Sequence, residues 1–423
     1  MKYFIILFFV WFGTDLLAQT PDSVYMPNIY SAKLYLRGSQ LAYPILSLGG
    51  NEQMELDFDD LDADVKTYYY TYQICNADWS PVQVSTFDYI RGFAQNQITD
   101  YHYSSVALIR YTHYHVQLPE NNSRLIASGN FLLKVYLNND TSQLAFTKRI
   151  LVVQNAVTIS AQILPPMNPQ FSWTHQKLQF TINSRALNIS SPFQQIHVVV
   201  LQNDRWDNAI YMGNPSFYSG TNFVYNSDDV PVFPGGNHWR WLDLQSFRFQ
   251  SDRIAHVDYQ KTGDVIYAKP DKDRSGLPYF NYGDNNGKYY IQTTDLNNSD
   301  WQGDYGRVRF VFVPPDNTAF EGKELYLLGE FTGYKLNETS RMVFNPANNI
   351  YEGSALMKMG FYNYAYVTID NNEHGAKPSF EFTEGNHFET ENNYNILVYY
   401  RPLGGRTDQL VGIYSMSSLN TLR

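Results

Sequence analysis

Apolar and polar residues alternate with a period of two along most of this chain. In Phe131–Leu137 one face carries only apolar residues, and Asn138–Asp140 then provides a turn. Tyrosines share one face of Tyr68–Tyr72, Arg307–Phe312 alternates arginine with apolar residues, and Phe361–Val367 repeats the pattern. Because successive side chains of a strand point to opposite faces, this alternation predicts strands with one buried face. Amphipathic helices are scarce, so the predicted fold class is all-β.

Two proline-rich breaks, Pro165–Pro169 and Pro314–Asp316, suggest how the strands are grouped. Short strands separated by Asn, Asp and Gly turns fit antiparallel β-sandwiches, whereas parallel sheets need crossover helices. We therefore expect tandem immunoglobulin-like or early-set sandwiches over residues 19–156, 157–315 and 316–423. A transmembrane β-barrel would also alternate, but the irregular strand lengths and spacing do not favour it.

The first eighteen residues have the pattern of a cleavable signal peptide. Lys2 supplies a positive start, Tyr3–Phe12 is apolar, and Leu16–Ala18 offers a small residue at the cleavage position before Gln19. A membrane-spanning helix needs about twenty apolar residues, so this stretch is too short to be one. No cysteine stands at the cleavage position directly after it, which argues against a lipid anchor. The predicted mature chain is exported without direct insertion into a membrane.

Composition narrows the range of partners. The net charge is −10, and nucleic-acid binding requires clustered Lys and Arg, so we expect no nucleic-acid partner. The chain has one cysteine, Cys75, and is therefore held together by apolar cores rather than disulfides. Aromatic residues make up 16 %, with 35 tyrosines, a residue favoured on half-buried sheets and at interfaces.

Three polar clusters are candidates for metal binding. Asp57–Asp64 carries several carboxylates, which are the ligands Ca²⁺ prefers. Asp271–Gly276 matches the opening of a calcium loop, but Tyr282 stands where the closing acid should be. His113 and His115, with His102 upstream, could share one face of a strand and hold zinc or copper. Acidic turns and ordinary histidines are the simpler interpretation of all three, so we expect no metal and no cofactor.

Enzyme motifs are missing, and one pattern suggests sugar binding. No nucleophile elbow, phosphate-binding loop, dinucleotide fingerprint or zinc-protease motif is present, although the paired carboxylates of a glycoside hydrolase leave no local signature. Leu325–Thr332 and Gly360–Val367 resemble early-set sandwiches that include glycogen-binding modules. Those modules stack sugars on tryptophan, and no tryptophan follows Trp301.

A more specific resemblance lies in the first predicted domain. The run Tyr68–Trp79 (YYYTYQICNADW) resembles the hallmark of the type IX secretion system plug proteins. Further similar pieces follow in order: Tyr89–Phe93, Ile98–Tyr101, Tyr111–Tyr114, Leu118–Pro119 and Ser128–Tyr136, then Tyr282–Gly287 in the middle domain. The residues that carry the motif, and that we take as candidate interface positions, are Tyr68, Tyr70, Tyr72, Asn76, Asp78, Trp79, Tyr89, Gly92, Phe93, Asp100, Tyr101, Tyr111 and His113.

The resemblance implies a non-enzymatic role with no catalytic residues. Plug proteins of this family close the periplasmic opening of a very large outer-membrane β-barrel translocon, so the implied partners are that barrel and its accessory subunits. The implied location is the periplasm, at the inner face of the outer membrane. A surface or periplasmic carbohydrate-binding or adhesion protein is the alternative, and a sandwich-based hydrolase a more distant one. Trp79 is expected to be either a core residue or an interface residue.

Overall fold

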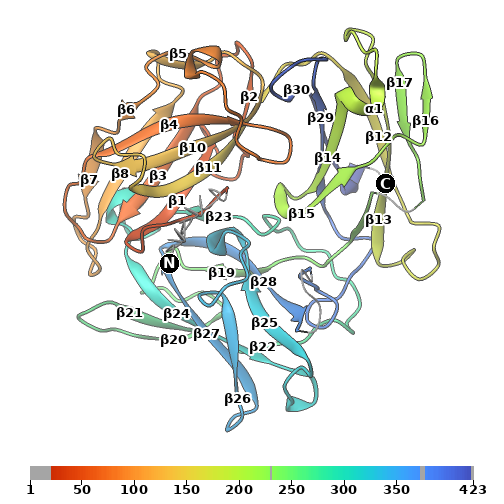
Figure 1. Cartoon of the computed structure of the whole chain (residues 1–423). Helices are drawn as coiled ribbons and strands as arrows, with labels where there is room; N and C mark the ends of the chain where they lie inside the picture. Colours follow the sequence, from red (N-terminus) through yellow and green to blue (C-terminus); the bar gives the residue numbers. More distant parts are fainter. Residues whose placement is uncertain (1–20, 229–230, 372–376, 421–423) are drawn as a thin grey trace, which may run out of the picture.

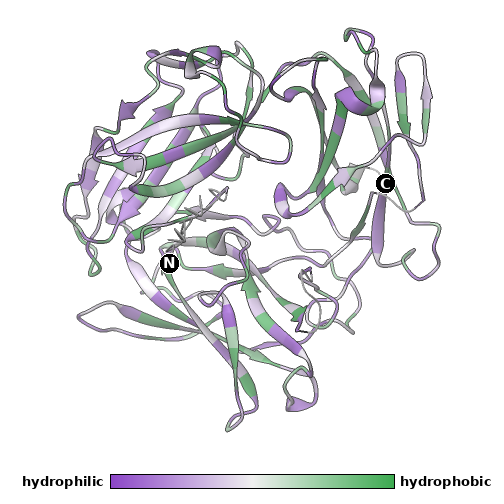
Figure 2. Ribbon diagram, viewed as in Figure 1, coloured by the Kyte–Doolittle hydropathy of each residue, from purple (hydrophilic) through white to green (hydrophobic). Residues whose placement is uncertain are grey.

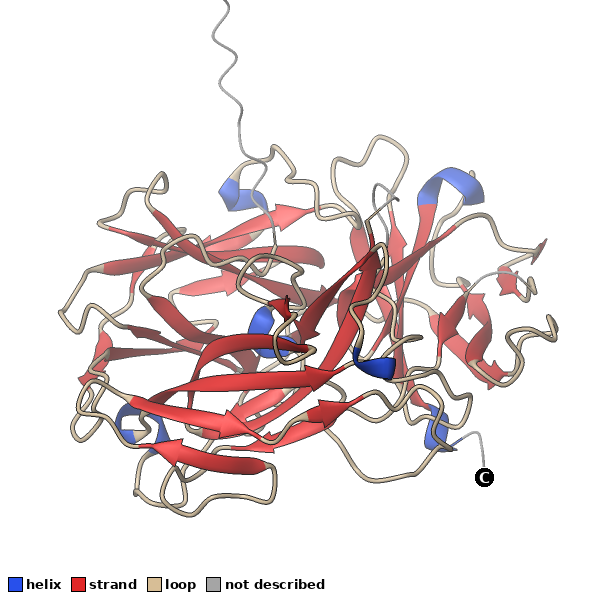
Figure 3. Cartoon of the chain, turned by 90° about the horizontal axis from the view of Figure 1, so that it is seen from below, coloured by secondary structure: helices blue, strands red, loops and turns tan. Residues whose placement is uncertain are grey.

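Strands are the predominant secondary structure of the chain. The computed structural model describes residues 21–228, 231–371 and 377–420; the predicted signal peptide, residues 1–18, lies outside them. Strands account for 47 % and helices for 5 % of the chain, which confirms the predicted all-β class (Figure 3). Three bodies surround a common centre in Figure 1, with the first sandwich at the upper left, the second at the upper right and a curled sheet below.

The first sandwich comprises two sheets that enclose one apolar core. The strands of its first sheet, in spatial order, are β1 (Ile29–Leu36), β3 (Met54–Asp60), β8 (Thr112–Leu118) and β7 (Asp100–Tyr103). Those of its second sheet are β2 (Ile45–Ser47), β11 (Leu144–Val153), β10 (Gly129–Leu137), β4 (Tyr68–Cys75) and β6 (Asn96–Gln97), and a small ribbon pairs β5 (Ile90–Gly92) with β9 (Ser123–Leu125). Both sheets contribute to the core, which includes Phe58, Tyr70, Phe131 and Ile150.

The second sandwich combines segments that are far apart in the sequence. One sheet contains β12 (Thr158–Leu164), β13 (His175–Asn183), β17 (Asn222–Tyr225) and β16 (Phe217–Ser219), with β18 (Val232–Pro234) also on β13. The facing sheet contains β15 (Arg205–Met212), β14 (Ile196–Gln202), β29 (Asn393–Tyr400) and β30 (Gln409–Ser417). The antiparallel register of β14 with β29 runs from Ile196 opposite Tyr400 to Gln202 opposite Tyr394.

The curled sheet contains ten strands folded around one core. Eight follow in the order β19 (Arg240–Asp243), β28 (Gly360–Asp370), β25 (Lys323–Leu328), β26 (Arg341–Asn345), β27 (Ile350–Lys358), β24 (Tyr305–Val313), β21 (Asp264–Ala268) and β20 (Ile254–Asp258). The other two are β22 (Asp271–Lys272) on β24 and β23 (Tyr289–Ile291) on β28. Strands from both ends of this order meet in a single apolar cluster, so the sheet closes over itself.

Helices are short and serve as connections. The α-helices are α1 (Pro192–Gln195) and α2 (Ser299–Gln302), and the 3₁₀ turns are η1 (Thr86–Asp88), η2 (Pro315–Asn317), η3 (Glu330–Thr332) and η4 (Ser418–Asn420). None of the helices in the described part of the chain has the length and apolar character to cross a membrane.

The sheets do not follow the expected divisions 157–315 and 316–423. The curled sheet takes strands from both sides of residue 315, and β29 and β30 return to the second sandwich. Pro314 and Pro315 lie in the connection of residues 314–322 from β24 to β25, two strands of the same sheet. Proline is suited to a turn between strands as well as to a linker, so this break did not mark a domain boundary. The first two sheets, by contrast, take all their strands from residues 29–153.

The predicted strand faces agree closely with the observed burial. Val308, Phe310 and Phe312 point into the curled sheet's core, while Arg307 and Arg309 are exposed. Figure 2 shows the same alternation between apolar and polar positions along many strands.

Candidate functional site

The tyrosines of the motif lie inside the first sandwich. Tyr68, Tyr70 and Tyr72 point from β4 into its core and are almost completely buried. Tyr68 donates a hydrogen bond to Asp60 Oδ2 (2.8 Å), and Tyr70 donates one to Glu120 Oε2 (2.6 Å). Burial, together with these carboxylates, raises the pKa of both phenols well above its ordinary value. These three residues therefore build the body and do not form its surface.

The motif continues into a tight turn after β4. The backbone N–H of Trp79 donates to Asn76 O (2.9 Å), and Asp78 Oδ1 accepts from both N (2.9 Å) and Oγ (2.6 Å) of Ser80. Trp79 itself has a φ of +66°, a conformation that is uncommon for a residue other than glycine. The turn thereby directs the indole away from its own sandwich while Asp78 stays exposed.

This turn docks the second sandwich onto the first. Arg401 Nη2 donates to Asn76 Oδ1 (2.8 Å), and the backbone N–H of Ala77 donates to Asp408 Oδ2 (2.9 Å). Arg401 and Asp408 are themselves paired, with Nε 2.7 Å from Oδ1. The Asn76 and Ala77 end of the motif is thus an internal contact between two bodies.

Trp79 occupies the apolar part of the same contact. Its ring meets Trp206 edge to face, with centroids 5.0 Å apart, and the Arg149 guanidinium lies 4.9 Å from the Trp79 ring centre. Leu132 from the first sandwich and Leu397 from the second pack in the same cluster. Trp79 is therefore a buried residue between two bodies of one chain.

The next part of the motif carries its most exposed aromatic residue. Tyr89 is buried and donates to Tyr72 O (3.2 Å), whereas Phe93 is 65 % exposed. Between them Gly92 has a φ of +104°, and a Cβ there would lie 1.9 Å from Asn122 O. Only glycine fits this position, which sets the direction in which Phe93 leaves the sandwich.

The remaining motif residues lie on two neighbouring parts of one sheet: its exposed edge strand, β7, and the buried region around β8. Asp100 and Tyr101 lie on β7, the edge strand of its sheet, and Tyr101 is 40 % exposed. Tyr111, next to the start of β8, is buried and donates to Gly303 O (2.6 Å) in the curled sheet's body. His113, on β8, is buried as well. The exposed aromatic residues that the motif contributes are thus Phe93 and Tyr101.

His113 belongs to a buried polar cluster that joins the first sandwich to the curled sheet. Asp59 Oδ1 lies 2.8 Å from His113 Nδ1, while Asp59 Oδ2 accepts from Tyr305 Oη (2.6 Å) and from Lys358 Nζ (2.5 Å). The side chains of Asp59 and Lys358 are each 1 % exposed. Two charged groups from different bodies are thus fully desolvated against each other, together with a histidine and a phenol.

The electrostatics of this cluster favour its charged forms. Burial alone would lower the pKa of His113, but hydrogen bonds to Asp57 and Asp59 raise it to about 9. Burial would raise the pKa of Asp59, yet Lys358 and His113 hold it below its ordinary value. His113 is therefore a cation at neutral pH and forms part of an ionic contact. The cavity beside it measures about 10 Å³, room for no more than one water molecule.

The clusters considered for metal binding are occupied by partners from the chain itself. Asp57 Oδ1 lies 2.7 Å from His115 Nδ1 and 3.4 Å from His113 Nε2, so both imidazoles face one carboxylate. Asp60 is paired with Lys66 Nζ at 2.9 Å. Within residues 21–228, 231–371 and 377–420, no three His, Cys, Asp or Glu side chains are arranged to hold a metal.

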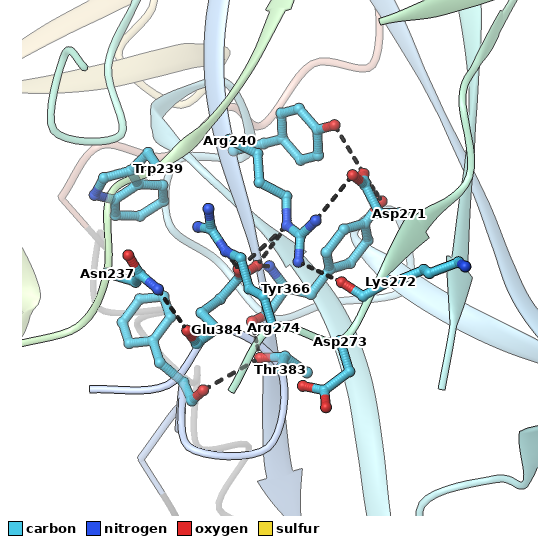
Figure 4. A network of polar contacts seen from close by, with 12 residues as sticks. Asn237, Trp239, Arg240, Asp271, Lys272, Asp273, Arg274, Tyr366, Thr383 and Glu384 are labelled. Atoms are coloured by element: carbon cyan, nitrogen blue, oxygen red, sulfur yellow. Dashed lines mark hydrogen bonds and ion pairs between the residues drawn. The ribbon is translucent and has the colours of Figure 1, made fainter. Parts of the chain in front are cut away.

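The second predicted calcium loop is part of an arginine network, shown in Figure 4. Arg240 Nη1 donates to Asp271 Oδ1 (2.9 Å), and Arg240 Nε donates to Glu384 Oε1 (3.0 Å). Glu384 also accepts from Arg274 Nε (2.5 Å), and Asp271 is paired with Arg253 as well. Burial would raise the pKa of Glu384, but Arg240 and Arg274 hold it low. Glu384 is therefore an ionised partner of two arginines, and the carboxylate of Asp271 is held by arginines as well.

Several residues of these contacts were not singled out from the sequence. Lys358 and Tyr305 complete the Asp59 cluster, while Arg401 and Trp206 complete the docking turn. Lys358 lies 299 positions from Asp59, so no local spacing links them. The one available signal was a charged residue in the apolar run Met357–Met359, since a lysine is seldom fully buried unless it is paired.

Comparison with known proteins shows which family the first sandwich matches. Residues 29–154 match the family described as "Type 9 secretion system plug protein 1st domain", a range that coincides with β1 to β11 of the first sandwich. No curated protein sequence matches the chain.

Two solved structures complete the comparison. A hypothetical protein from Parabacteroides merdae ATCC 43184 is 29 % identical, with a TM-score of 0.89 over 95 % of this chain and 100 % of its own. A trypsin-activated alpha-2-macroglobulin from Escherichia coli is 9 % identical, with a TM-score of 0.16 over 95 % of this chain and 29 % of that one. Residues 29–154 are therefore a first domain of the type 9 secretion system plug protein family.

Proposed function

We propose that this chain is a non-enzymatic plug that closes the periplasmic opening of the outer-membrane translocon of the type 9 secretion system. The observation that carries the proposal is the family match over the whole first sandwich, which supports a role associated with this secretion system. The proposed partners are the barrel protein and its accessory subunits, and the proposed location is the inner face of the outer membrane.

The way the three bodies are joined supports a mechanical role. A gate has to stay folded as one body while it blocks a wide pore. The Asp59–Lys358 pair joins the first sandwich to the curled sheet, and Arg401 with Trp79 joins the first sandwich to the second. Such buried, paired contacts favour one arrangement of the bodies, because any other packing that buried these charges without their partners would be destabilised.

The buried ionisable groups support a structural rather than catalytic use. Catalytic acids and bases need space for a substrate beside them. The cavity at Asp59 and His113 has about 10 Å³, and the carboxylates of Asp271 and Glu384 are held by arginines. The proposed activity is therefore binding alone.

The surface proposed to meet the translocon is the exposed part of the motif, Phe93 and Tyr101. β7 is an edge strand, and an edge offers backbone groups to which a strand of another protein can add. Tyr103, two residues beyond Tyr101 on the same strand, is exposed as well, with its ring centre 6.1 Å from that of Tyr101. Tyrosine suits such a contact because its ring is rigid and amphipathic.

Co-purification tests the proposal. The tagged chain, expressed in a bacterium that has this secretion system, should recover the barrel protein, identified by mass spectrometry. The variant Phe93→Glu/Tyr101→Glu should lose it. The matched control is Phe217→Glu/Tyr218→Glu, on edge strand β16 of the second sandwich, where the exposures of 61 % and 38 % resemble the 65 % and 40 % of the test pair. Failure of the wild-type chain to recover any translocon subunit would refute the proposed function, and equal recovery by both variants would refute the proposed surface.

A further inference from the structure

A groove of about 1150 Å³ runs between the start of the first sandwich and the outer face of the curled sheet. One wall is formed by residues 22–32, which lead into β1, and the other by the stretch from Glu330 to Val343. Its floor is the outward face of β24 and β27. β1 and β24 lie close together in Figure 1, and Ser31 Oγ lies 2.7 Å from Tyr305 Oη at the inner end.

Three cations that line this groove form no ion pair with another described residue, although the protein as a whole is acidic. Arg307 and Arg309 point outward from β24, and Lys148 reaches the same space from β11. In the described part of the chain, none of these three side chains forms an ion pair or a side-chain hydrogen bond. Exposed arginines two residues apart on a strand lie on the same face, so their charges add over the floor.

Most acids that line the groove are already neutralised by cations. Asp22 is paired with Arg149, and Glu330 lies 2.5 Å from Lys33 Nζ. Glu338 lies 3.5 Å from Arg341 Nη1. The carboxylate that has no cationic partner is Glu352, which accepts a hydrogen bond from Asn345. The groove therefore presents a net positive surface in a protein of net charge −10.

Apolar and aromatic groups accompany these charges. Val24 and Val343 are exposed at opposite walls, and Tyr267 lies beside Arg309 in the sheet register. The volume exceeds the roughly 300–1,000 Å³ typical of small-molecule pockets. A groove of this volume, with a cationic floor and apolar walls, suits a polypeptide that carries both carboxylates and apolar side chains.

We infer that this groove binds an acidic polypeptide segment of a partner protein, with Arg307 and Arg309 as the residues that recognise its carboxylates. Val24 and Val343 then cover the apolar side chains of the segment. The inference stands independently of the plug function, because binding is a property of the isolated chain and involves a surface separate from Phe93 and Tyr101.

Fluorescence anisotropy on the mature chain tests this directly. The probe is a labelled peptide in which glutamate and tyrosine alternate, and the comparison peptide has lysine in place of glutamate. We expect saturable binding of the acidic peptide, weakening as salt is added, and little binding of the basic one. Arg307→Glu/Arg309→Glu should weaken binding by about tenfold or more.

The matched control is Arg91→Glu/Arg124→Glu. These two arginines face each other in the pairing of β5 with β9, are exposed, and change the net charge equally while lying outside the groove. The control should bind like the wild type, and all three chains should melt at similar temperatures because the altered residues are exposed. Wild-type affinity in the Arg307/Arg309 variant, equal losses in both variants, or binding to phosphatidylglycerol vesicles in place of the peptide would overturn the inference.

Discussion

Replacing Lys358 with methionine removes one half of the buried pair that joins the first sandwich to the curled sheet. Methionine keeps most of the side-chain volume, so the change in the free energy of unfolding reports mainly the lost charge. Asp59 would remain ionised and buried, with His113 at 2.8 Å and Tyr305 at 2.6 Å as its remaining partners. Breaking a fully buried ion pair on one side typically costs about 3–5 kcal/mol.

The structure places the expected cost near the lower end of that range. His113 is positively charged at neutral pH and still compensates Asp59, so we expect a loss of about 3 kcal/mol for Lys358→Met. Asp59→Asn leaves Lys358 without its anion and is expected to cost at least as much. The double variant should cost less than the sum of the two single changes, because it leaves neither charge unpaired.

Urea unfolding followed by tryptophan fluorescence measures these changes in the free energy of unfolding. Lys358 also contacts Asp300 and Tyr111, so hydrogen exchange should show the weakened contact at these two residues. Arg37→Met provides the control, since its pair with Glu55, at 3.5 Å, is largely exposed and should contribute less than about 1 kcal/mol. A loss below about 1 kcal/mol for Lys358→Met, or strict additivity in the double variant, would refute the claim that this pair locks the two bodies.

Three further predictions concern single residues. Trp79→Ala should destabilise the chain by about 3–5 kcal/mol, because it empties a buried contact with Trp206, and an unchanged melting temperature would contradict this placement. His113 has its pKa raised to about 9, so its stabilising contribution, about 3 kcal/mol at most, is fully present below pH 6.5 and is lost as the pH rises through 9. The stability difference between wild type and His113→Gln should therefore shrink over that interval, and a pH-independent difference would disprove the assignment. Cys75 is buried with its pKa raised to about 12, so the native chain should not react with a maleimide until it unfolds, and rapid labelling would contradict its burial.

The strands were predictable because their signal is local. Val308, Phe310 and Phe312 alternate with arginines, and that alternation is enough to assign the two faces of β24. Tyr68, Tyr70 and Tyr72 were assigned to one face for the same reason, and all three are buried on it.

Burial on the second face of a strand was not predictable. Leu132 lies on the face of β10 that the alternation assigns to solvent, yet it is buried, because the second sandwich packs over it. The grouping of strands was missed for a related reason. β14 pairs with β29 across almost two hundred residues, and no periodicity records which distant strand completes a sheet.

In the candidate site, too, local features could be predicted from the sequence and long-range contacts could not. The motif identified the family and the turn at Asn76–Trp79, but it could not show that Asn76 is held by Arg401, 325 positions away. Seven further motif positions turned out to be buried: Tyr68, Tyr70, Tyr72, Trp79, Tyr89, Tyr111 and His113. A family motif marks positions where one residue type is needed, and here that need is often internal packing rather than partner contact.

Outer-membrane permeability tests the proposed gating most directly. In a bacterium that uses this secretion system, deletion of the gene for this chain should make cells sensitive to vancomycin, which an intact outer membrane excludes. Additional deletion of the translocon barrel should restore resistance, because the open pore is then gone. Unchanged sensitivity after loss of this chain, or sensitivity that persists without the barrel, would contradict the account.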